Sequence, residues 1–202
     1  MIIEIRIMKN LFVACIMLSL YSCKKDKAGI APETIESIAT YTKHTILQGQ
    51  HFSDKSSFKS FSGNKMDFKV KFDSSAIYQT VDPVNQFDIN KLYGFSEGSD
   101  HHVNSARIGW AWNRNALRLY AYVYSGGIRK MKEITTAGIG PEISCSIGIS
   151  GNQYLFSINE ITLGLERAIE GPAIAGYGLY PYFGGDEVAP GNISIYIMDV
   201  KK

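Results

Sequence analysis

An alternation of apolar and polar side chains with a period of two constrains the fold of this chain more than any other feature, and it starts at about residue 44. In the segment MDFKVKF (66–72), apolar side chains alternate with aspartate and lysine. Successive side chains of a strand point to opposite faces of a sheet, so this pattern is typical of an antiparallel strand with one buried face. No long helical periodicity follows residue 50.

Turn-forming residues join two pairs of such segments, which predicts two β-hairpins. The pairs are 107–112 with 117–124, around Asn113-Arg114-Asn115, and 142–150 with 154–159, around Gly151-Asn152. Another alternating strand covers 192–198, whereas residues 74–104 alternate less and contain many turn formers, which predicts a long connection. Many short strands separated by turns predict an all-β fold, an antiparallel β-sandwich or jelly roll.

Composition excludes several classes of protein. Lys and Arg number 21 and Asp and Glu number 19, so the net charge is +2 and no nucleic-acid partner is expected. Three cysteines are too few for a disulfide-dense scaffold or a four-cysteine zinc site. Cys145 lies in an alternating run and is predicted to be a small buried hydrophobe.

The first 22 residues read as a secretory signal peptide, beginning at Met1 or at Met8. Basic residues precede an apolar run of about a dozen residues, which is too short for a transmembrane helix. Leu20-Tyr21-Ser22-Cys23 resembles the lipobox of bacterial lipoproteins, which implies acylation of Cys23 and a membrane anchor. No Asp follows Cys23, which favours the outer membrane of the cell envelope. An ordinary signal peptide with a chance cysteine is the alternative.

These observations divide the chain into three parts. Residues 1–22 form the signal peptide, residues 23–43 a lipidated tether, and residues 44–202 the β-sandwich domain. Within the tether, apolar residues at helical spacing predict a short helix over Thr34–Tyr41.

One face of the predicted strand 117–124 combines tyrosines with an arginine. Leu117, Leu119, Ala121 and Val123 form the apolar row, which leaves Arg118, Tyr120, Tyr122 and Tyr124 on the opposite face. On the partner strand Ile108, Trp110 and Trp112 are expected in the core, with Arg107, Gly109 and Ala111 beside the tyrosines. Small residues next to tyrosine rings predict a flat aromatic floor that suits sugars. The alternative is that another element covers these tyrosines.

A second candidate segment is Tyr180–Glu187. Gly184-Gly185 permits a sharp turn, after which Asp186 and Glu187 are candidates for binding calcium or a sugar hydroxyl, or are solvated turn charges. No other cofactor is expected. The candidate glycan-binding residues are Arg107, Arg118, Tyr120, Tyr122, Tyr124, Tyr182 and Asp186.

An enzymatic alternative rests on the histidines of the long connection. His101 and His102 lie near Asp100 and Asn104, but a third metal ligand is not evident, so no metal site is predicted. A lyase acting on uronates needs a base and a cation that neutralises the carboxylate. The residues of these types are Tyr122, His102, Arg107 and Arg118.

Four segments resemble a family of uncharacterised lipoproteins from Bacteroidota. They are FDSSAIYQTVDPVNQFDINKLYGFS (72–96), HHVNSARIGWAW (101–112), LRLYAYVYSGG (117–127) and LYPYFGGDEVAP (179–190). The resemblance implies a concanavalin A-like jelly roll, the architecture of many lectins, glucanases and polysaccharide lyases, and it implies no established activity. A basic residue often stands between the two tryptophans in that family, whereas this chain has Ala111.

The leading hypothesis is an outer-membrane lipoprotein whose non-catalytic β-sandwich binds a glycan, or a partner protein, on its aromatic face. A polysaccharide lyase or glycoside hydrolase acting on uronate-containing glycans is the first alternative. A structural envelope protein is the second, and it predicts that residues 34–60 cover the floor. The oligomeric state and the side of the membrane stay open.

Overall fold

The computed structural model describes residues 40–200. The signal peptide, Cys23 and residues 34–39 of the expected helix lie outside this range, and Thr40 and Tyr41 are not helical. Within residues 40–200, no helix has the length and apolarity needed to cross a membrane.

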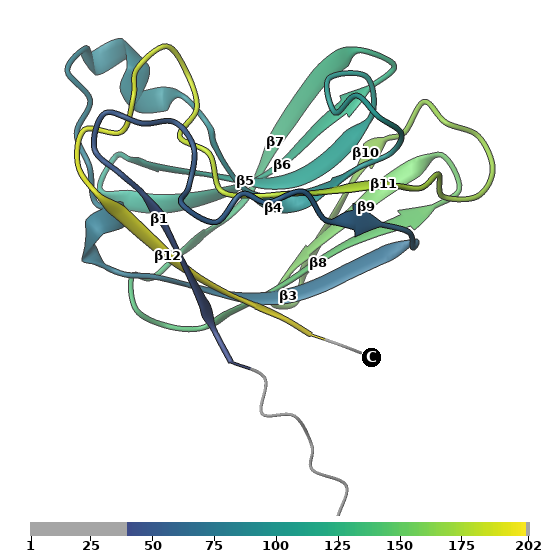
Figure 1. Ribbon diagram of the computed structural model, residues 1–202, viewed down its shortest axis with the longest axis horizontal. Helices are drawn as coiled ribbons and strands as arrows, with labels where there is room; N and C mark the ends of the chain where they lie inside the picture. Colours follow the sequence, from purple (N-terminus) through teal and green to yellow (C-terminus); the bar gives the residue numbers. More distant parts are fainter. Residues whose placement is uncertain (1–39, 201–202) are drawn as a thin grey trace, which may run out of the picture. The chain divides into compact units, whose positions relative to one another are not determined.

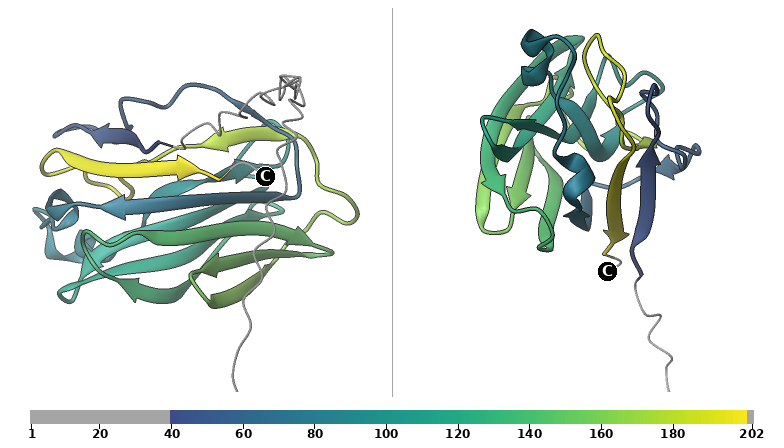
Figure 2. Two further views of the ribbon diagram at one scale, coloured as in Figure 1. Left: turned by 90° about the horizontal axis from the view of Figure 1, so that it is seen from below. Right: turned by 90° about the vertical axis from the view of Figure 1, so that its left-hand side faces the viewer.

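Two six-stranded antiparallel sheets form this part of the chain (Figure 1), which confirms the all-β sandwich. The β3 sheet contains, in spatial order, β1 (Thr42–Ile46), β12 (Ile193–Asp199), β3 (Lys65–Phe72), β8 (Ile143–Ser150), β9 (Gln153–Ile158) and β10 (Ile161–Glu166). The β5 sheet contains β2 (Ser60–Phe61), β11 (Gly176–Leu179), β4 (Asn90–Ser96), β5 (Ser105–Asn113), β6 (Ala116–Ser125) and β7 (Ile128–Ala137). Figure 2 shows the first and last strands, β1 and β12, side by side.

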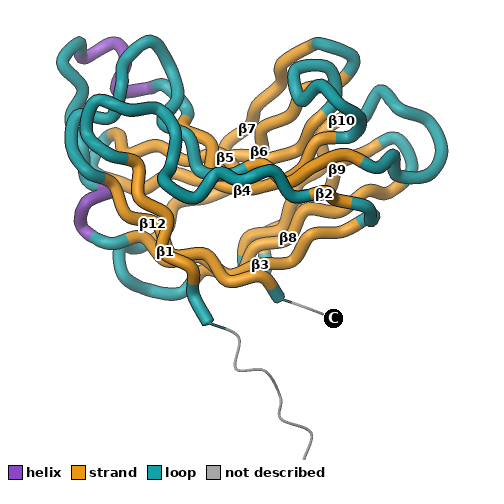
Figure 3. Tube along the Cα trace, in the orientation of Figure 1, coloured by secondary structure: helices purple, strands orange, loops and turns teal. Residues whose placement is uncertain are grey.

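Two short 3-10 helices interrupt the connection between β3 and β4, and Figure 3 shows them at one end of the sandwich. They are η1 (Ser74–Ala76) and η2 (Pro83–Phe87). The carboxylates of Asp73 and Asp82 accept hydrogen bonds from the first turns of η1 and η2. Side chains of this type satisfy the free N–H groups of a helix start.

The core lies between the two sheets and contains the residues that the alternation assigned to it. The apolar row of β6 is completely buried, as are Ile108 and Trp110 of β5, and Trp112 packs against them partly buried. Trp110 contacts the rings of Phe72 and Tyr78 at centroid distances of 5.3 and 5.8 Å. Cys145 is buried as predicted, and burial raises the pKa of its thiol.

Four strands differ from the expected organisation. β1 begins two residues before the expected boundary at residue 44, and β4 lies inside the segment expected to be a connection. A register shift between Lys91 and Tyr93 disrupts the alternation of β4, because a β-bulge changes which face each side chain takes. β7 and β10 are edge strands with few buried side chains, so their sequences carry no clear alternation.

A buried ion pair fixes the segment after β10 to the end of β4. Glu97 Oε2 accepts hydrogen bonds from Arg167 Nε at 2.7 Å and from the Tyr154 hydroxyl at 2.6 Å. Glu97 Oε1 accepts from Arg167 Nη2 at 2.8 Å and from the Ile174 N–H at 3.0 Å. Burial raises the pKa of Glu97, but these hydrogen bonds outweigh it and the net shift is downward.

Candidate functional site

A cleft of about 640 Å³ lies on the face of the β5 sheet that points away from the core. Figure 1 shows this face between the loops around η2 on one side and the β6–β7 hairpin on the other. Side chains from β4, β5, β6, β7 and β11 and from residues 52–58 line the cleft. The lining residues are Phe52, Ser56–Phe58, Lys91, His101, His102, Arg107, Tyr122, Tyr124, Arg129, Tyr177–Tyr182 and Gly185.

Arg107 lies at the floor of this cleft, and only 7% of its surface is exposed. Its guanidinium carbon is 5.3 Å from the ring centroid of Tyr122, the residue opposite it on β6. Gly94 gives the arginine room on the other side, since a Cβ there would lie 2.9 Å from Arg107 Cγ. Within residues 40–200, Arg107 Nε has no hydrogen-bond partner and the guanidinium forms no ion pair. Burial lowers the pKa of Arg107, and a buried charge without a partner is costly.

Two further cations line the same cleft. The ammonium of Lys91 lies 5.3 Å from the ring centroid of Tyr122 and 5.6 Å from that of Tyr182. The pKa of Lys91 is lowered to about 8, mainly by burial and then by the charges of Arg107 and Arg129, while Asp88 opposes this shift. Arg129 is exposed and lies opposite Tyr124 in the sheet. No Asp or Glu of the described chain lines the cleft, so its charge favours an anion.

A histidine and a tyrosine form a polar pair at one end of the cleft. His101 Nδ1 and the hydroxyl oxygen of Tyr177 are 2.7 Å apart. Burial, followed by the charges of Arg107 and His102, lowers the pKa of His101, so the imidazole is neutral at pH 7. A neutral imidazole accepts a proton, which makes this pair the best-placed acid–base group in the cleft.

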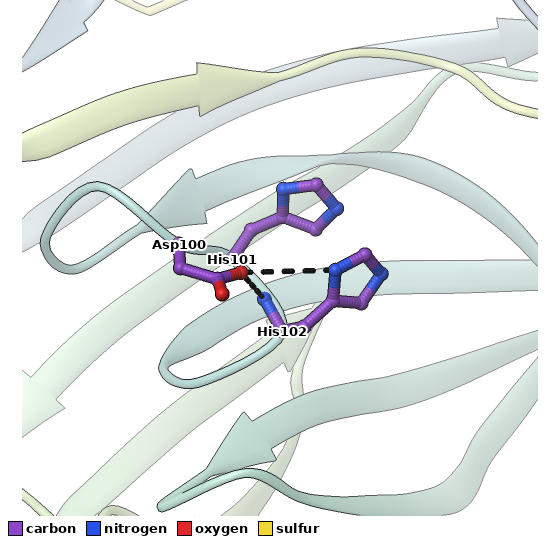
Figure 4. Close-up of side chains that lie close together, drawn as sticks. All are labelled: Asp100, His101 and His102. Carbon is purple, nitrogen blue, oxygen red and sulfur yellow. Dashed lines mark hydrogen bonds and ion pairs between the residues drawn. The ribbon is translucent and has the colours of Figure 1, made fainter.

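Asp100, His101 and His102 are the residues of this site that could hold a metal ion (Figure 4). One potential ligand atom from each lies within 4.8 Å of the other two. The Asp100 carboxylate also accepts a hydrogen bond from the His102 N–H at 2.8 Å, which shapes the loop. His102 Nδ1 lies 3.7 Å from an oxygen of the same carboxylate. All three residues come from one turn, and His101 Nδ1 is already paired with Tyr177.

Two exposed phenylalanines stand at the rim of the cleft. Phe52 is 64% exposed and packs edge-on against Tyr182 at a centroid distance of 5.0 Å. Phe58 is 78% exposed and lies 5.5 Å from the ring of Tyr177. Phe52 forms a β-bridge with Tyr182, and the carbonyl of Lys59 accepts a hydrogen bond from the Gly178 N–H, so the backbone fixes both positions.

The structure brings five of the sequence-predicted site residues together. Arg107, Tyr122, Tyr124, Tyr182 and His102 line the cleft. The register explains the first three, because Arg107 lies opposite Tyr122, and Tyr124 follows on the same face of β6.

Arg118, Asp186 and Glu187 do not line the cleft, although Arg118 and Asp186 are among the candidate glycan-binding residues and Glu187 is a calcium candidate. Arg118 forms an ion pair with Glu133 at 2.8 Å. Asp186 is exposed in a turn. Both carboxylate oxygens of Glu187 accept hydrogen bonds, from the N–H groups of residues 81 and 82 and from the Asn85 side chain. Glu187 therefore holds the loop before η2 in place.

The floor predicted above Gly109 and Ala111 is not open, and Tyr120 is absent from the cleft lining. A Cβ on Gly109 would lie 2.5 Å from Ile89 Cγ2, so Ile89 fills the space that glycine leaves. Ala111 is completely buried. The segment around residue 89 thus covers the glycine beside Tyr120. Residues 52–58 line the cleft without covering it, with Phe52 beside Tyr182 and Phe58 beside Tyr177.

Several lining residues were not predicted from the sequence, namely Phe52, Phe58, Lys91, Arg129 and Tyr177. Arg129 could have been found by continuing the strand register beyond the Gly126-Gly127 turn, which pairs it with Tyr124. Lys91 follows an irregular register and carries no such signal. Phe52, Phe58 and Tyr177 reach the cleft only through long-range pairing of residues 51–61 with residues 176–183.

No family model matches this sequence, and no curated protein matches it. Solved structures with a similar fold include an endo-β-1,3(4)-glucanase of family GH16, with 10% identity and a TM-score of 0.48. That match covers 72% of this chain and 62% of the glucanase. The PL7 alginate lyase AlyA1 from Zobellia galactanivorans has 12% identity and a TM-score of 0.48, over 88% of this chain and 84% of the lyase.

The carbohydrate-binding module CBM66 from Bacillus subtilis is a third similar structure, with 8% identity and a TM-score of 0.35 over 78% of this chain and 88% of the module. At these identities no residue correspondence is carried over to this chain. The comparisons do not identify the lipoprotein family that the sequence resembles.

Proposed function

We propose that this cleft binds an acidic glycan through carboxylate groups. The observation that carries the proposal is Arg107, a buried cation with no acidic partner in residues 40–200, at the floor of a tyrosine-lined cleft. Lys91, which forms no ion pair with the part of the chain that the structure describes, adds a second cation beside the same tyrosine ring. A carboxylate in the cleft would offset the cost of burying these charges.

The aromatic lining supports a sugar as the carrier of that carboxylate. Tyrosine rings present flat apolar faces and hydroxyl groups, which suit the C–H faces and hydroxyls of a pyranose ring. Five tyrosines line the cleft: Tyr122, Tyr124, Tyr177, Tyr180 and Tyr182. The names of the similar structures, a glucanase, an alginate lyase and a carbohydrate-binding module, agree with a glycan ligand without carrying the argument.

Calorimetric titration of the full chain with uronate, sulfated and neutral oligosaccharides tests this function. We expect binding of uronates, and a loss of about a hundredfold in affinity in Arg107→Met and in Lys91→Met, since each removes a charge-assisted contact. Arg118→Met is the matched control, because it removes the same charge from the same face outside the cleft. Equal binding of neutral glycans, or unchanged affinity in both cleft variants, would contradict the proposal.

A second candidate function, β-elimination of a uronate polymer, is favoured by the pair His101–Tyr177 beside Arg107. Arg107 would neutralise the carboxylate, which acidifies the adjacent C–H, and neutral His101 would take that proton. The C–H electrons form the new double bond, the glycosidic C–O bond breaks, and the Tyr177 hydroxyl gives a proton to the leaving oxygen. The absence of an Asp or Glu among the described lining residues gives less support to two-carboxylate hydrolysis.

Ultraviolet absorbance of unsaturated products across a panel of uronate polymers tests the second function. Elimination predicts product formation that His101→Ala and Tyr177→Phe abolish while binding is kept. Absorbance that stays flat with every polymer, in a protein that binds them, leaves the non-catalytic function.

The membrane anchor is a separate proposal that rests on the sequence around Cys23. Metabolic labelling with a fatty-acid analogue tests it. We expect the wild-type chain to be labelled in the outer-membrane fraction and Cys23→Ser to be unlabelled, and equal labelling of both would contradict the anchor.

A further inference from the structure

The cleft has a linear order that the strand register defines. Lys91 lies opposite Gly109, Gly94 lies opposite Arg107, and Ser96 lies opposite Ser105 near the end of β4. The distance from Lys91 to Ser96 along the strand is about 16 Å, from a rise of about 3.3 Å per residue. Arg107 therefore lies between the two ends of an elongated floor.

Each end of this floor carries one aromatic platform. Tyr182 forms a β-bridge with Lys91, and Phe52 packs against Tyr182, so Phe52 belongs to the Lys91 end. The Tyr177 N–H donates a hydrogen bond to the Ser96 hydroxyl oxygen, and Phe58 packs against Tyr177, so Phe58 belongs to the opposite end. The two platforms are thus separated along the strand direction, with Arg107 between them.

Both phenylalanine side chains are exposed and held in place in the ligand-free protein. Their exposed fractions of 64% and 78% are high for a large apolar side chain, and no other ring than the adjacent tyrosine contacts either of them in the described chain. Their backbones are pinned, because Ser53 N–H donates to the Pro181 carbonyl and Gly178 N–H donates to the Lys59 carbonyl. A rigid aromatic ring loses little conformational entropy on binding.

Resting on the function proposed above, we infer that the cleft takes several consecutive units of a linear uronate polymer. A central carboxylate lies on Arg107, and the flanking sugars pack on Phe52 and Phe58. The ligand is therefore a chain segment long enough to reach both phenylalanines. The cations of the floor favour acidic over neutral sugars, and the two phenylalanines favour chains long enough to reach both of them.

Titrations of the full chain with a size series of alginate oligosaccharides and of oligogalacturonates test the inference. We expect Phe52→Ala and Phe58→Ala each to weaken hexasaccharide binding by about three- to tenfold, as for the loss of one aromatic contact, and to leave disaccharide binding unchanged. Phe87→Ala is the matched control, because Phe87 is 56% exposed and lies outside the cleft. It should bind both sizes as the wild type does.

The outcomes separate the inference from the proposed function. If both sizes bind equally well in the wild type, or if the phenylalanine variants keep full hexasaccharide affinity, the extended chain is wrong while the acidic site stands. If Phe52→Ala and Phe58→Ala weaken disaccharide and hexasaccharide to the same degree, the platforms are not separate from the central site. If no uronate binds the wild type, both proposals fail.

Discussion

Replacement of Arg107 by methionine should stabilise the ligand-free protein while it weakens ligand binding about a hundredfold. Methionine keeps the aliphatic volume of the arginine stem beside Gly94 and discards the charge. The wild-type charge is nearly completely buried, and Nε has no hydrogen-bond partner in the described chain. Burial of the charge without a partner therefore destabilises the ligand-free protein, and a bound carboxylate offsets this destabilisation.

The expected magnitude follows from two opposing contributions. Replacing buried ionic groups with apolar side chains of similar volume stabilises by up to about 4 kcal/mol. Loss of the contact between the guanidinium and the Tyr122 ring, at 5.3 Å, costs about 0.5 to 2 kcal/mol. We therefore expect the free energy of unfolding to rise by about 1 to 2 kcal/mol, which corresponds to an increase in Tm of about 2 to 8 °C.

Urea and thermal unfolding of wild type and variant, with and without uronate oligosaccharide, measure both effects. A ligand at about 100 times its Kd stabilises the wild type by about 2.7 kcal/mol. With a hundredfold weaker affinity, the same concentration should stabilise Arg107→Met by only about 0.4 kcal/mol. Arg118→Met, which breaks a solvent-accessible ion pair, should shift the free energy of unfolding by no more than about 1 kcal/mol. A loss of more than about 1 kcal/mol in ligand-free Arg107→Met would show that the guanidinium is a structural group and refute the reasoning.

Three further predictions concern Lys91, Arg167 and Gly94. Affinity for a uronate hexasaccharide should fall as pH rises through about 8, because Lys91 has a pKa of about 8 and loses its charge there. Titrations between about pH 7 and 9 measure this change, and the affinity of Lys91→Met should not vary over the same range. Arg167→Met should lower the free energy of unfolding by about 3 to 5 kcal/mol in urea titrations, because it leaves Glu97 buried without its cation. A change below about 1 kcal/mol would show that the buried ion pair does not stabilise the fold. Gly94→Ala should lower the free energy of unfolding by about 1 to 3 kcal/mol, because the added Cβ would lie 2.1 Å from the Ala106 carbonyl oxygen. An unchanged Tm in calorimetry would contradict this, because it would show that β4 shifts to accommodate the methyl group without loss of stability.

The outcome for the tyrosine row shows how far strand periodicity reaches. The alternation placed Tyr120, Tyr122 and Tyr124 on one face of β6, and the register confirms this placement. It could not say what lies above each ring, because that depends on segments distant in sequence. Ile89 comes to lie over Gly109 beside Tyr120, whereas the ring of His102 packs edge-on against Tyr124 at a centroid distance of 5.2 Å.

The charged residues show the same limit. Arg107 and Arg118 both lie on the outer face of the β5–β6 hairpin, and the strand pattern does not distinguish them. The tertiary structure separates them, because Glu133 on β7 pairs with Arg118 and no acid reaches Arg107 within residues 40–200. The absence of an acidic partner, on which the proposed ligand contact of Arg107 rests, therefore cannot be predicted until the strands are paired.

The sequence by itself determined the class of fold, the strands of the two central hairpins and which of their side chains enter the core. Side-chain period and turn chemistry are local properties, so they can be read along the chain. Only the tertiary structure decided that Lys91 joins Arg107 and Tyr122, and that Phe52 and Phe58 flank them. Those contacts depend on the pairing of strands far apart in sequence and on the local register shift of β4, neither of which the period of the alternation encodes.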